Sequence, residues 1–409
     1  MIRFPLRILW RIESWCKMKD IYIAGAVRTA IGGFMGGLKD KEAHELGTVA
    51  IKEVIKRSNI DVEKIDEVIM GNILASGQGQ GPGRQASVNA GIPVEVPAWS
   101  INQLCGSGLK TVCLGANSIK AGEAECVIAG GMESMSRASH LAEFVRSGSK
   151  MGNVKLLDSM IHDGLTDAFT GEHMGVTAEW IAEKYDISRL AQDEFAFNSQ
   201  QKAKFAQENN LFAEEIVGVA IPQRKKDDII ISHDEHPRHV TSMESLGKLR
   251  AAFKKDGTVT PGNASGVNDG AAAISVVSED FLNNNNLKPF ARIAGYATTG
   301  LDPKFMGLGP IEATKLALKR AGWTMDDIDL IEANEAFAVQ SLAVGRELNI
   351  DPAKLNVNGG AIALGHPIGA SGARILVTLL YEMQRRNLKK GLATLCVGGG
   401  MGVAVLVER

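Results

Sequence analysis

The chain has 409 residues, of which 45% are hydrophobic and 22% are charged, so it can bury a sizeable core in two or three domains. Lys and Arg total 45 against 47 Asp and Glu, and a formal charge of −2 argues against a nucleic-acid partner. Five cysteines are too few for a disulfide framework and indicate a reducing compartment. No apolar run approaches the ~18 residues of a membrane span, so we expect no membrane partner. Glycine is in excess, with 45 residues against a usual share of about 7%, which indicates tight turns or close backbone approaches.

The first 17 residues differ from the rest. Residues 1–17 place Arg3, Arg7 and Arg11 among large apolar side chains, which loosely resembles an organelle presequence. They contain one Ser and no evident cleavage pattern, and Met18 directly precedes a predicted strand. We therefore place residues 1–17 outside the fold as an extension and expect a cytoplasmic protein, with an organelle as the alternative.

The remainder is predicted to be a duplication. Dipeptides recur at one constant offset, each inside an apolar helix, a short turn and an apolar strand. The matching pairs are Lys56-Arg57 with Lys319-Arg320 and Ile65-Asp66 with Ile328-Asp329. The opening strands also match, Ile23-Ala24-Gly25 with Ile293-Ala294-Gly295.

Both halves continue with alternating helices and strands, which is typical of a layered α/β fold. The first half has a predicted helix over 106–120 and a strand over 125–129. The second has a helix over 369–386 and strands over 392–397 and 403–408. A glycine-rich turn joins the last two strands and predicts a hairpin, so we expect a mixed sheet.

Residues from about 137 to 266 have no counterpart in the second half. This polar segment contains one predicted helix over 190–207 and precedes a boundary between the halves at 283–286. We interpret it as an insert over the core that supplies binding loops.

Cys105 is the first candidate reactive residue, in the turn NQLCGSG between a strand and a helix. The positive end of the helix dipole favours a thiolate there, and thus a better nucleophile. Gly106 and Gly108 would let a substrate come close. The alternative is a small buried hydrophobe, which is our interpretation of Cys113 and Cys126.

Three further residues are candidates, and two of them lie in similar glycine-rich turns. His366, in GHPIGASG, has roughly the place of Cys105 in the other half, so pseudo-symmetry would pair them, with the histidine as base, proton shuttle or oxyanion donor. A purely structural histidine is the alternative. Cys396, in CVGGGMG, ends a buried strand; its thiol could move a proton, and the following amides could stabilise an oxyanion. Asn334 follows a strand over 328–332 and either caps the next helix or holds a water or carbonyl.

Two other ligand classes are not supported by the sequence. The run GQGQGPG at 77–83 lacks the strand, helix and acidic partner of a dinucleotide fingerprint, and no GxxxxGK[ST] is present. His233, His236 and His239 are evenly spaced but lie in a polar loop without a carboxylate or Cys cluster. We expect neither a metal nor a nucleotide cofactor.

NQLCGSG, NEAFA, GHPIGASG and CVGGGMG, in this order and with these separations, resemble the thiolase family from residue 18 onward. The segments GEHMG, NASG and DPKFMG are most similar to its biosynthetic acetyl-CoA acetyltransferases. The resemblance implies an α/β fold of the layered α-β-α-β-α type, built from two duplicated halves with mixed five-stranded sheets and an inserted loop domain. The implied parts are 18–136 with 267–288 (N-terminal half), 137–266 (CoA-binding and tetramerisation insert) and 289–409 (C-terminal half).

The resemblance also implies a mechanism. Cys105 would carry the acetyl group as a thioester, with His366 accepting its proton, and Cys396 would remove a proton from the methyl group of a second acetyl-CoA. His366 and a water on Asn334 would hold one oxyanion, and the amides of Cys105 and Gly398 the other. The product would be acetoacetyl-CoA plus CoA, with no cofactor beyond the CoA thioesters.

The implied substrate contacts lie in or beside the insert. They are Arg238 and Ser265 for CoA, and His173, Met174 and Met306 at the acyl and pantetheine end. The two methionines could instead be core filling. The family also suggests a homotetramer, a dimer of dimers, joined near residues 139–161.

Three other functions share part of this pattern. A degradative 3-ketoacyl-CoA thiolase would share every catalytic residue, but Met174 and the Phe305-Met306 pair would close the acyl end and favour short chains. A ketoacyl or hydroxymethylglutaryl-CoA synthase would have a second His or a Glu in place of Cys396. A non-catalytic acyl-CoA or lipid-binding relative would lack at least one reactive residue, whereas all are present.

Overall fold

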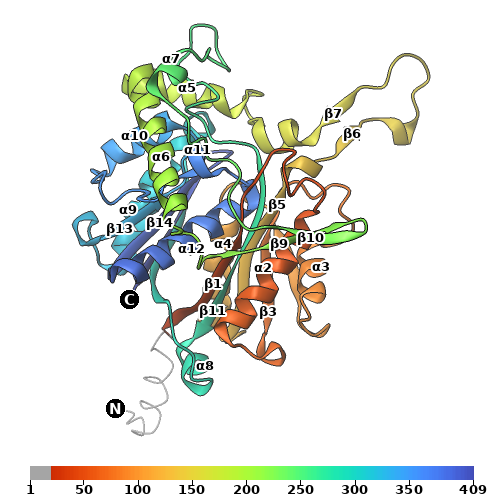
Figure 1. Ribbon diagram of the computed structural model, residues 1–409, viewed down its shortest axis with the longest axis vertical. Coiled ribbons are helices and arrows are strands. Elements are labelled where there is room, and N and C mark those ends of the chain that lie inside the picture. The colour runs from red at the N-terminus through yellow and green to blue at the C-terminus, as the bar shows by residue number, and fades with distance from the viewer. Residues whose placement is uncertain (1–19) are drawn as a thin grey trace, which may run out of the picture.

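Residues 20–409 are described by a computed structural model, and the predicted extension, residues 1–17, lies outside them. One large mixed sheet runs through the molecule in the order β13-β14-β15-β12-β1-β11-β5-β3-β4. The N-terminal elements lie on one side and the C-terminal elements on the other, with the insert across the top and front of the view (Figure 1). Within the described residues, no helix is long and apolar enough to cross a membrane.

The first half contributes five strands of the main path and four helices. The strands are β1 (Ile21–Thr29), β3 (Glu67–Gly71), β4 (Ala98–Ile101), β5 (Cys126–Ser134) and β11 (Asn268–Ser278). The helices are α2 (Ala43–Ser58), α3 (Pro82–Asn89), α4 (Ser107–Ala121) and α8 (Glu279–Asn284). Two short strands, β2 (Gly32–Gly33) and β8 (Ile216–Val217), pair with β11 and β1.

The second half repeats this plan with one strand reduced. Its strands are β12 (Ala291–Gly300), β13 (Leu330–Ala333), β14 (Lys390–Val397) and β15 (Met401–Glu408). Its helices are α9 (Gly309–Ala321), α10 (Ala338–Glu347), α11 (Ala361–Leu364) and α12 (Ile368–Arg386). The predicted hairpin is confirmed, since β14 and β15 pair antiparallel while β13 and β14 pair parallel. At the fifth position only an isolated bridge between Ile331 and Leu355 forms, so the expected five strands are complete in the first half alone.

Matching irregularities confirm that the halves are duplicated. β1 and β12 each carry a register shift, between Ile23 and Gly25 and between Ile293 and Gly295, the tripeptides that match in sequence. The matched aspartates also have the same role. The carboxylate of Asp66 accepts the backbone N–H groups of Glu125 and Cys126, and that of Asp329 accepts those of Lys389 and Lys390. Asp66 therefore fixes the start of β5, which pairs with β3, and Asp329 fixes the start of β14, which pairs with β13.

The layers follow from which sheet face each helix covers. α4 and α12 contact each other and lie between the two parts of the sheet, α4 on β3 and β5, and α12 on β5, β11, β13 and β14. α2 covers the outer face of β1, β5 and β11, and α9 covers that of β12, β14 and β15. The predicted layered α-β-α-β-α fold is confirmed. The exact boundaries of the insert and the halves stay a prediction.

Glycines let the two central helices meet at their N-terminal ends. A Cβ at Gly108 in α4 would lie 2.7 Å from the backbone N of Ala373 in α12, and one at Gly372 would run into the backbone N of Leu109. Because backbone packs on backbone here, the loops that precede α4 and α12 come together. Those loops contain Cys105 and His366.

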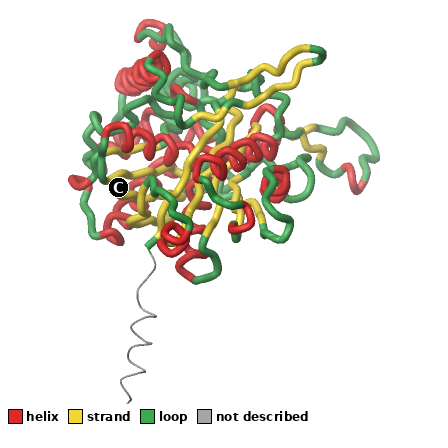
Figure 2. Tube along the Cα trace, turned by 60° about the horizontal axis from the view of Figure 1, so that its bottom comes forward, coloured by secondary structure: helices red, strands yellow, loops and turns green. Residues whose placement is uncertain are grey.

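The insert consists of two longer helices and two hairpins. They are α5 (Met174–Tyr185) and α6 (Arg189–Glu208), close to the helix predicted over 190–207, with the hairpins β6–β7 (His140–Ala142, Leu156–Asp158) and β9–β10 (Val219–Gln223, Lys226–Ile231). A one-turn helix, α7 (Met243–Gly247), follows them. Both hairpins extend away from the body (Figures 1 and 2).

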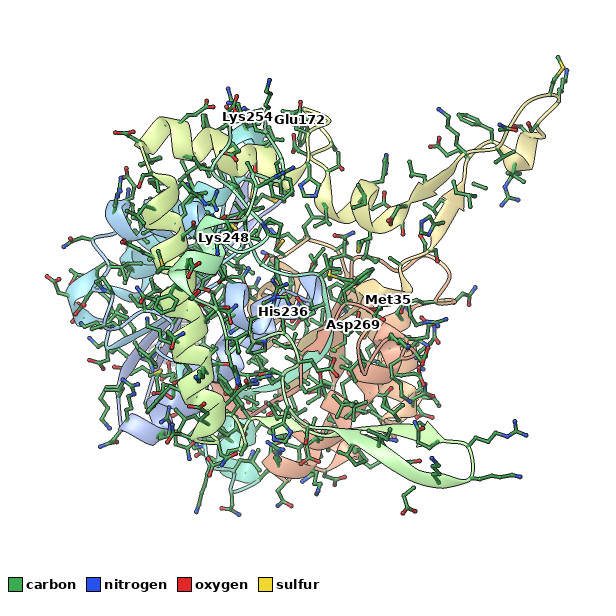
Figure 3. All side chains as sticks on the ribbon, turned by 45° about the horizontal axis from the view of Figure 1, so that its top comes forward. Met35, Glu172, His236, Lys248, Lys254 and Asp269 are labelled. Carbon is green, nitrogen blue, oxygen red and sulfur yellow. The ribbon has the colours of Figure 1, made fainter. Side chains whose placement is uncertain are left out.

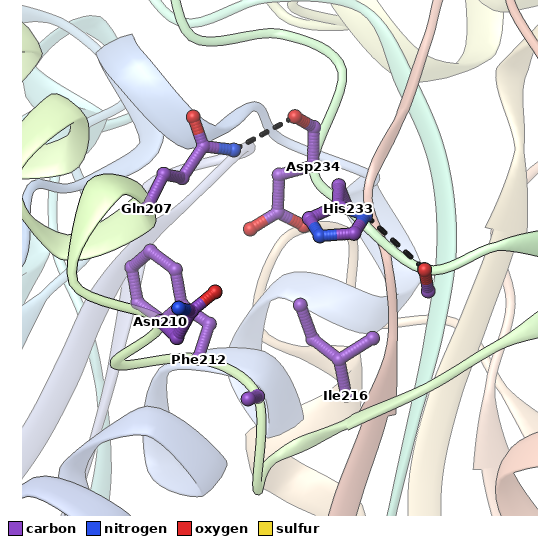
Figure 4. Close-up of a pocket in the computed structure, with 8 residues that line it drawn as sticks. Gln207, Asn210, Phe212, Ile216, His233 and Asp234 are labelled. Atoms are coloured by element: carbon purple, nitrogen blue, oxygen red, sulfur yellow. Dashed lines mark hydrogen bonds between the residues drawn. The ribbon is translucent and has the colours of Figure 1, made fainter.

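A buried ion cluster ties the insert to β1. The guanidinium of Arg28, fully buried, donates from Nε to Glu215 Oε1 (2.6 Å) and from Nη1 to Asp234 Oδ1 (2.7 Å). The backbone carbonyl of Asp234 also accepts a hydrogen bond from the Gln207 side chain, beside a cavity of about 180 Å³ (Figure 4). The insert is therefore fixed to the core by charged groups that have no access to water.

Candidate active site

Cys105 lies in a tight turn at the start of α4. Leu104 has a left-handed backbone (φ 48°), and Gly106 is the N-cap of the helix. The Ser107 hydroxyl donates to the Leu104 carbonyl (2.8 Å) and accepts from the Gln103 amide (2.8 Å), which closes the turn. The thiol is thereby held at the N-terminal end of the helix.

His366 has the equivalent position in the second half, one residue before Pro367, the N-cap of α12. Its Nε2 lies 3.3 Å from Cys105 Sγ, so the predicted pairing of the two loops is present. The backbone N–H of His366 donates to Asn268 Oδ1 (2.8 Å), which holds the loop against β11. A Cβ at Gly365, whose φ is +106°, would collide with the Asn268 side chain, so only glycine fits there.

The hydrogen bonds of Ser371 determine which nitrogen of His366 carries the proton. Ser371 Oγ donates its single proton to the Pro367 carbonyl (2.9 Å) and lies 2.5 Å from His366 Nδ1. A carbonyl cannot donate, so both contacts are hydrogen bonds only in the tautomer in which Nδ1 donates to Oγ. Nε2 is then unprotonated in the neutral ring and faces the thiol as a base.

Burial sets the resting charge of this pair. It raises the pKa of Cys105 to about 11, although the amides of Gly398 and Cys105 itself act to lower it. Burial, with a smaller contribution from Arg374, lowers the pKa of His366 to about 3. The expectation that the helix terminus favours a resting thiolate is therefore wrong, because desolvation outweighs the amides. The resting pair is neutral, and His366 must take the proton as the sulfur attacks.

Cys396 and Asn334 lie at the ends of neighbouring strands. Cys396 pairs with Gly402 across the β14–β15 hairpin and is buried. Burial raises the pKa of its thiol, and ionisation of Cys105 would raise it further, which indicates that the two sulfurs lie close together. Asn334 does not cap α10, whose N-cap is Phe337.

The Asn334 side chain is free to bind a ligand. Its backbone N–H donates to the Thr394 carbonyl (3.0 Å), but neither Oδ1 nor Nδ2, both buried, has a hydrogen-bond partner among residues 20–409. Buried amides are normally paired, and an unpaired one costs about 1–3 kcal/mol. This arrangement suits a water or a substrate oxygen.

A cavity of about 710 Å³ leads to His366. Four of the five predicted substrate-binding residues line it: His173, Met174, Arg238 and Ser265. The His173 ring stacks on Phe253 (4.7 Å between centroids) and its Nδ1 accepts the Gly175 amide, so the first turn of α5 forms part of the wall. His236, which also lines this cavity, lies between the two halves in Figure 3.

A second cavity, of about 570 Å³, adjoins the nucleophile loop. Leu104, Gly398, Phe169, Met401 and Met174 line it, so Met174 borders both cavities. Met306 lines neither of them and is buried in the apolar core behind α5. This burial agrees with the core-filling alternative, and the contact of Met306 with the substrate stays a prediction.

Three residues that support the site were not predicted from the sequence. Ser371 lies inside the quoted GHPIGASG motif, and its position in the first turns of the following helix could have pointed to it. Asn268 and Glu133 have no comparable signal, because each acts on the site only through contacts between distant segments.

Comparisons with known proteins agree with this geometry. The family models described as "Thiolase, N-terminal domain" and "Thiolase, C-terminal domain" match residues 21–280 and 287–409. The chain therefore belongs to the thiolase family. An acetyl-CoA acetyltransferase of Chromobacterium violaceum is 56% identical over 390 residues, which is 95% of this chain and 100% of the relative.

Solved structures resemble the whole described chain. The acetyl-CoA acetyltransferase of Bacillus anthracis superimposes with a TM-score of 0.93 and 42% identity, covering 96% of this chain and 99% of that one. Human mitochondrial 3-ketoacyl-CoA thiolase in complex with CoA superimposes with a TM-score of 0.92 and 44% identity, covering 96% and 98%.

Proposed function

We propose that the protein is an acetyl-CoA C-acetyltransferase, which reversibly condenses two acetyl-CoA molecules to acetoacetyl-CoA and CoA. The observation that carries the proposal is the neutral Cys105–His366 pair, with the unprotonated Nε2 3.3 Å from the thiol. The relatives named acetyl-CoA acetyltransferase and the CoA-bound neighbour support the substrate class.

In the first half-reaction, Cys105 Sγ attacks the carbonyl carbon of acetyl-CoA while its proton moves to His366 Nε2. The amides of Cys105 and Gly398 hold the resulting oxyanion. When the tetrahedral intermediate collapses, the C–S bond to CoA breaks, and the CoA thiolate takes a proton from Cys396. Acetyl-Cys105, a Cys396 thiolate and an imidazolium remain.

In the second half-reaction, His366 Nε2–H and a water on Asn334 hold the thioester oxygen of the incoming acetyl-CoA. Cys396 takes a proton from the methyl carbon, and the carbanion attacks the acetyl-Cys105 carbonyl. Collapse breaks the Cys105–acyl bond, and the Cys105 thiolate recovers its proton from His366. The cycle needs no metal or redox cofactor, because the thioester itself acidifies the α-carbon.

CoA is proposed to occupy the larger cavity, with Arg238 and Ser265 as its contacts and His173 and Met174 toward the pantetheine end. The Arg238 side chain is exposed and has no hydrogen bond or ion pair within residues 20–409, so its guanidinium is available to a phosphate.

Acetylation of Cys105 tests the proposal. The protein is mixed with acetyl-CoA and the acetyl adduct is mapped by mass spectrometry; we expect it on Cys105, and none there in Cys105→Ser. An unmodified wild type, or an adduct that survives the substitution, contradicts the assignment. Cys396→Ala should retain the adduct but lose condensation and cleavage; loss of the adduct as well would point to a structural role.

A degradative 3-ketoacyl-CoA thiolase is the second candidate, favoured by the cavity of about 570 Å³ beside Leu104 and Gly398, which offers space for an acyl chain. We expect acetoacetyl-CoA to be cleaved far faster than a long 3-ketoacyl-CoA, because the Met174 side chain borders both cavities and occupies space that a long acyl chain would need. Equal rates of cleavage for the short and the long substrate would favour a degradative 3-ketoacyl-CoA thiolase.

We also propose a homotetramer and a cytoplasmic location. The arm formed by β6, β7 and their connection exposes Phe144 (78%), Met151 (94%) and Leu156 (64%), apolar surface that a partner subunit could cover. Light scattering gives the subunit number, and a monomer would contradict the assembly. A processed N-terminus near Met18 in an organelle fraction would contradict the location.

A further inference from the structure

Glu133 is a buried carboxylate at the C-terminal end of β5, beside the meeting point of the two central helices. Its exposed fraction is 0%, and no Lys, Arg or His of the described residues forms an ion pair with it. A carboxylate in such surroundings is costly unless hydrogen bonds replace its hydration. Its bonding partners therefore indicate what the residue does.

Four N–H donors surround this carboxylate. Oε1 accepts from Asn72 Nδ2 (2.9 Å) and the Leu74 amide (3.1 Å), and Oε2 accepts from the amides of Ile73 (3.2 Å) and Gly369 (2.9 Å). Each oxygen thus receives two donors, which matches the capacity of an ionised carboxylate. Three of the four are backbone groups, so the carboxylate holds main chain in place.

These donors belong to the segments that carry the catalytic pair. Gly369 is the second residue of α12 and follows His366 by three positions. Ile73 and Leu74 form an apolar cluster with Ile368, against which Cys105 packs. The Glu133 carboxylate on β5 therefore binds both the start of α12, which follows His366, and the apolar residues Ile73 and Leu74, whose cluster contacts Cys105.

The backbone around Gly369 leaves little room for adjustment. A Cβ at Gly369 would lie 2.8 Å from the Met132 carbonyl oxygen and 2.9 Å from Glu133 Oε2, and one at Gly131 would run into the Gly369 carbonyl. Because these groups already touch, a change in the Glu133 bonds would displace the N-terminus of α12.

We propose that Glu133 is a positioning residue, which ties the N-terminus of α12 and the wall behind Cys105 to β5 and so maintains the contact between Cys105 Sγ and His366 Nε2. This role rests on the proposed function. Glu133 itself touches neither reacting atom; it acts through the Gly369, Ile73 and Leu74 amides. Burial raises the pKa of Glu133 to about 7, and its ionised form adds only a small contribution to the raised pKa of Cys105.

Glu133→Gln tests the role with little change in volume. Asn72 can turn its amide to meet the new NH2 group, but the backbone N–H groups cannot turn, so at least one of them loses its acceptor. We expect kcat to fall about tenfold with KM for acetyl-CoA within twofold, because a displaced base affects the chemical step and leaves the CoA cavity intact. Glu133→Asp keeps the charge on a shorter side chain and should lower kcat in the same way. It replaces the glutamine variant in the test if that variant does not fold.

The matched control is Asp66→Asn, in the residue before β3, whose carboxylate binds the opposite end of β5. Asp66 also accepts two backbone amides, those of Glu125 and Cys126, but lies away from the pair. We expect its kcat to stay within twofold of wild type. An equal loss of kcat in Glu133→Gln and Asp66→Asn would mean that any loss of hydrogen bonds to β5 lowers the activity. That result would overturn the positioning role of Glu133.

A readout independent of acetyl transfer separates this inference from the proposed function. The rate at which iodoacetamide alkylates Cys105 at pH 7.5, followed by mass spectrometry, depends on proton transfer to His366 and not on CoA. It should fall about tenfold in Glu133→Gln and change less than twofold in Asp66→Asn. A wild type that does not accept acetyl groups refutes the function and leaves this comparison valid. A wild-type alkylation rate in both Glu133 variants refutes the role of Glu133.

Discussion

Ser371→Ala tests the protonation of His366 on which the chemistry depends. Without the hydroxyl, Nδ1–H is buried with no acceptor, at a cost of about 1–3 kcal/mol, unless the proton moves to Nε2. In that tautomer the ring no longer offers Cys105 a base. At about 1.4 kcal/mol per factor of ten, the productive form is depleted roughly 5- to 150-fold, and the rate of Cys105 acetylation should fall by the same factor. Ser371 does not line the CoA cavity, so KM should change little.

The measurement is single-turnover acetylation of Cys105 by acetyl-CoA, quenched at intervals and read by mass spectrometry. Ser58→Ala is a suitable control, because it removes another buried hydroxyl, bonded to the Val54 carbonyl (2.6 Å) in the outer helix α2. If Ser371→Ala is acetylated as fast as wild type and Ser58→Ala, then Ser371 does not determine the tautomer, and the assignment of Nε2 as the base fails.

Three further predictions follow from burial and packing. Alkylation of Cys105 should change less than twofold between pH 7 and 9, because the pair stays neutral between its pKa values of about 3 and about 11 and His366 takes the proton within the pair; a tenfold rise per pH unit would show that the free thiolate reacts without His366 as its base. Gly108→Ala should lower the free energy of unfolding in urea by about 1–3 kcal/mol, since its Cβ meets the backbone of α12, whereas Gly345→Ala, with nothing within 4 Å, should not lower it. Arg28→Met leaves two buried carboxylates without their cation and should cost about 3–5 kcal/mol of unfolding free energy; a loss below 1 kcal/mol would show that the ion cluster is dispensable.

Local patterns in the sequence predicted the elements well. The helix expected over 190–207 is α6, and the hairpin expected after 392–397 is present, because apolar periodicity and glycine turns are properties of neighbouring residues. The pairing of Cys105 with His366 could also be predicted, since the duplication places both at the residue before an N-cap. Because the two halves are repeats, their local similarity predicts that equivalent residues far apart in the sequence lie at equivalent places in the fold.

Properties that depend on burial were not accessible in this way. The sequence placed Cys105 beside a helix terminus and so favoured a thiolate, but the desolvation that raises its pKa comes from packing by several segments. Met306 lies in the segment DPKFMG, yet whether its side chain faces a cavity or the core depends on how α5 packs. Glu133 has no motif at all, because its partners come from two segments distant from it in the sequence, residues 72–74 and the start of α12.

The duplication explains why the site needs two different residues at equivalent positions. Symmetry gives the molecule two central helices whose N-terminal ends meet, and a thiol at both would provide no base, because burial keeps each thiol protonated near neutral pH. His366 in place of a second thiol supplies an acceptor whose low pKa leaves it unprotonated until the sulfur attacks. Away from this meeting point, Asp66 and Asp329 keep the same structural role in both halves. The halves therefore differ in the residues that perform chemistry and agree in those that hold the strands.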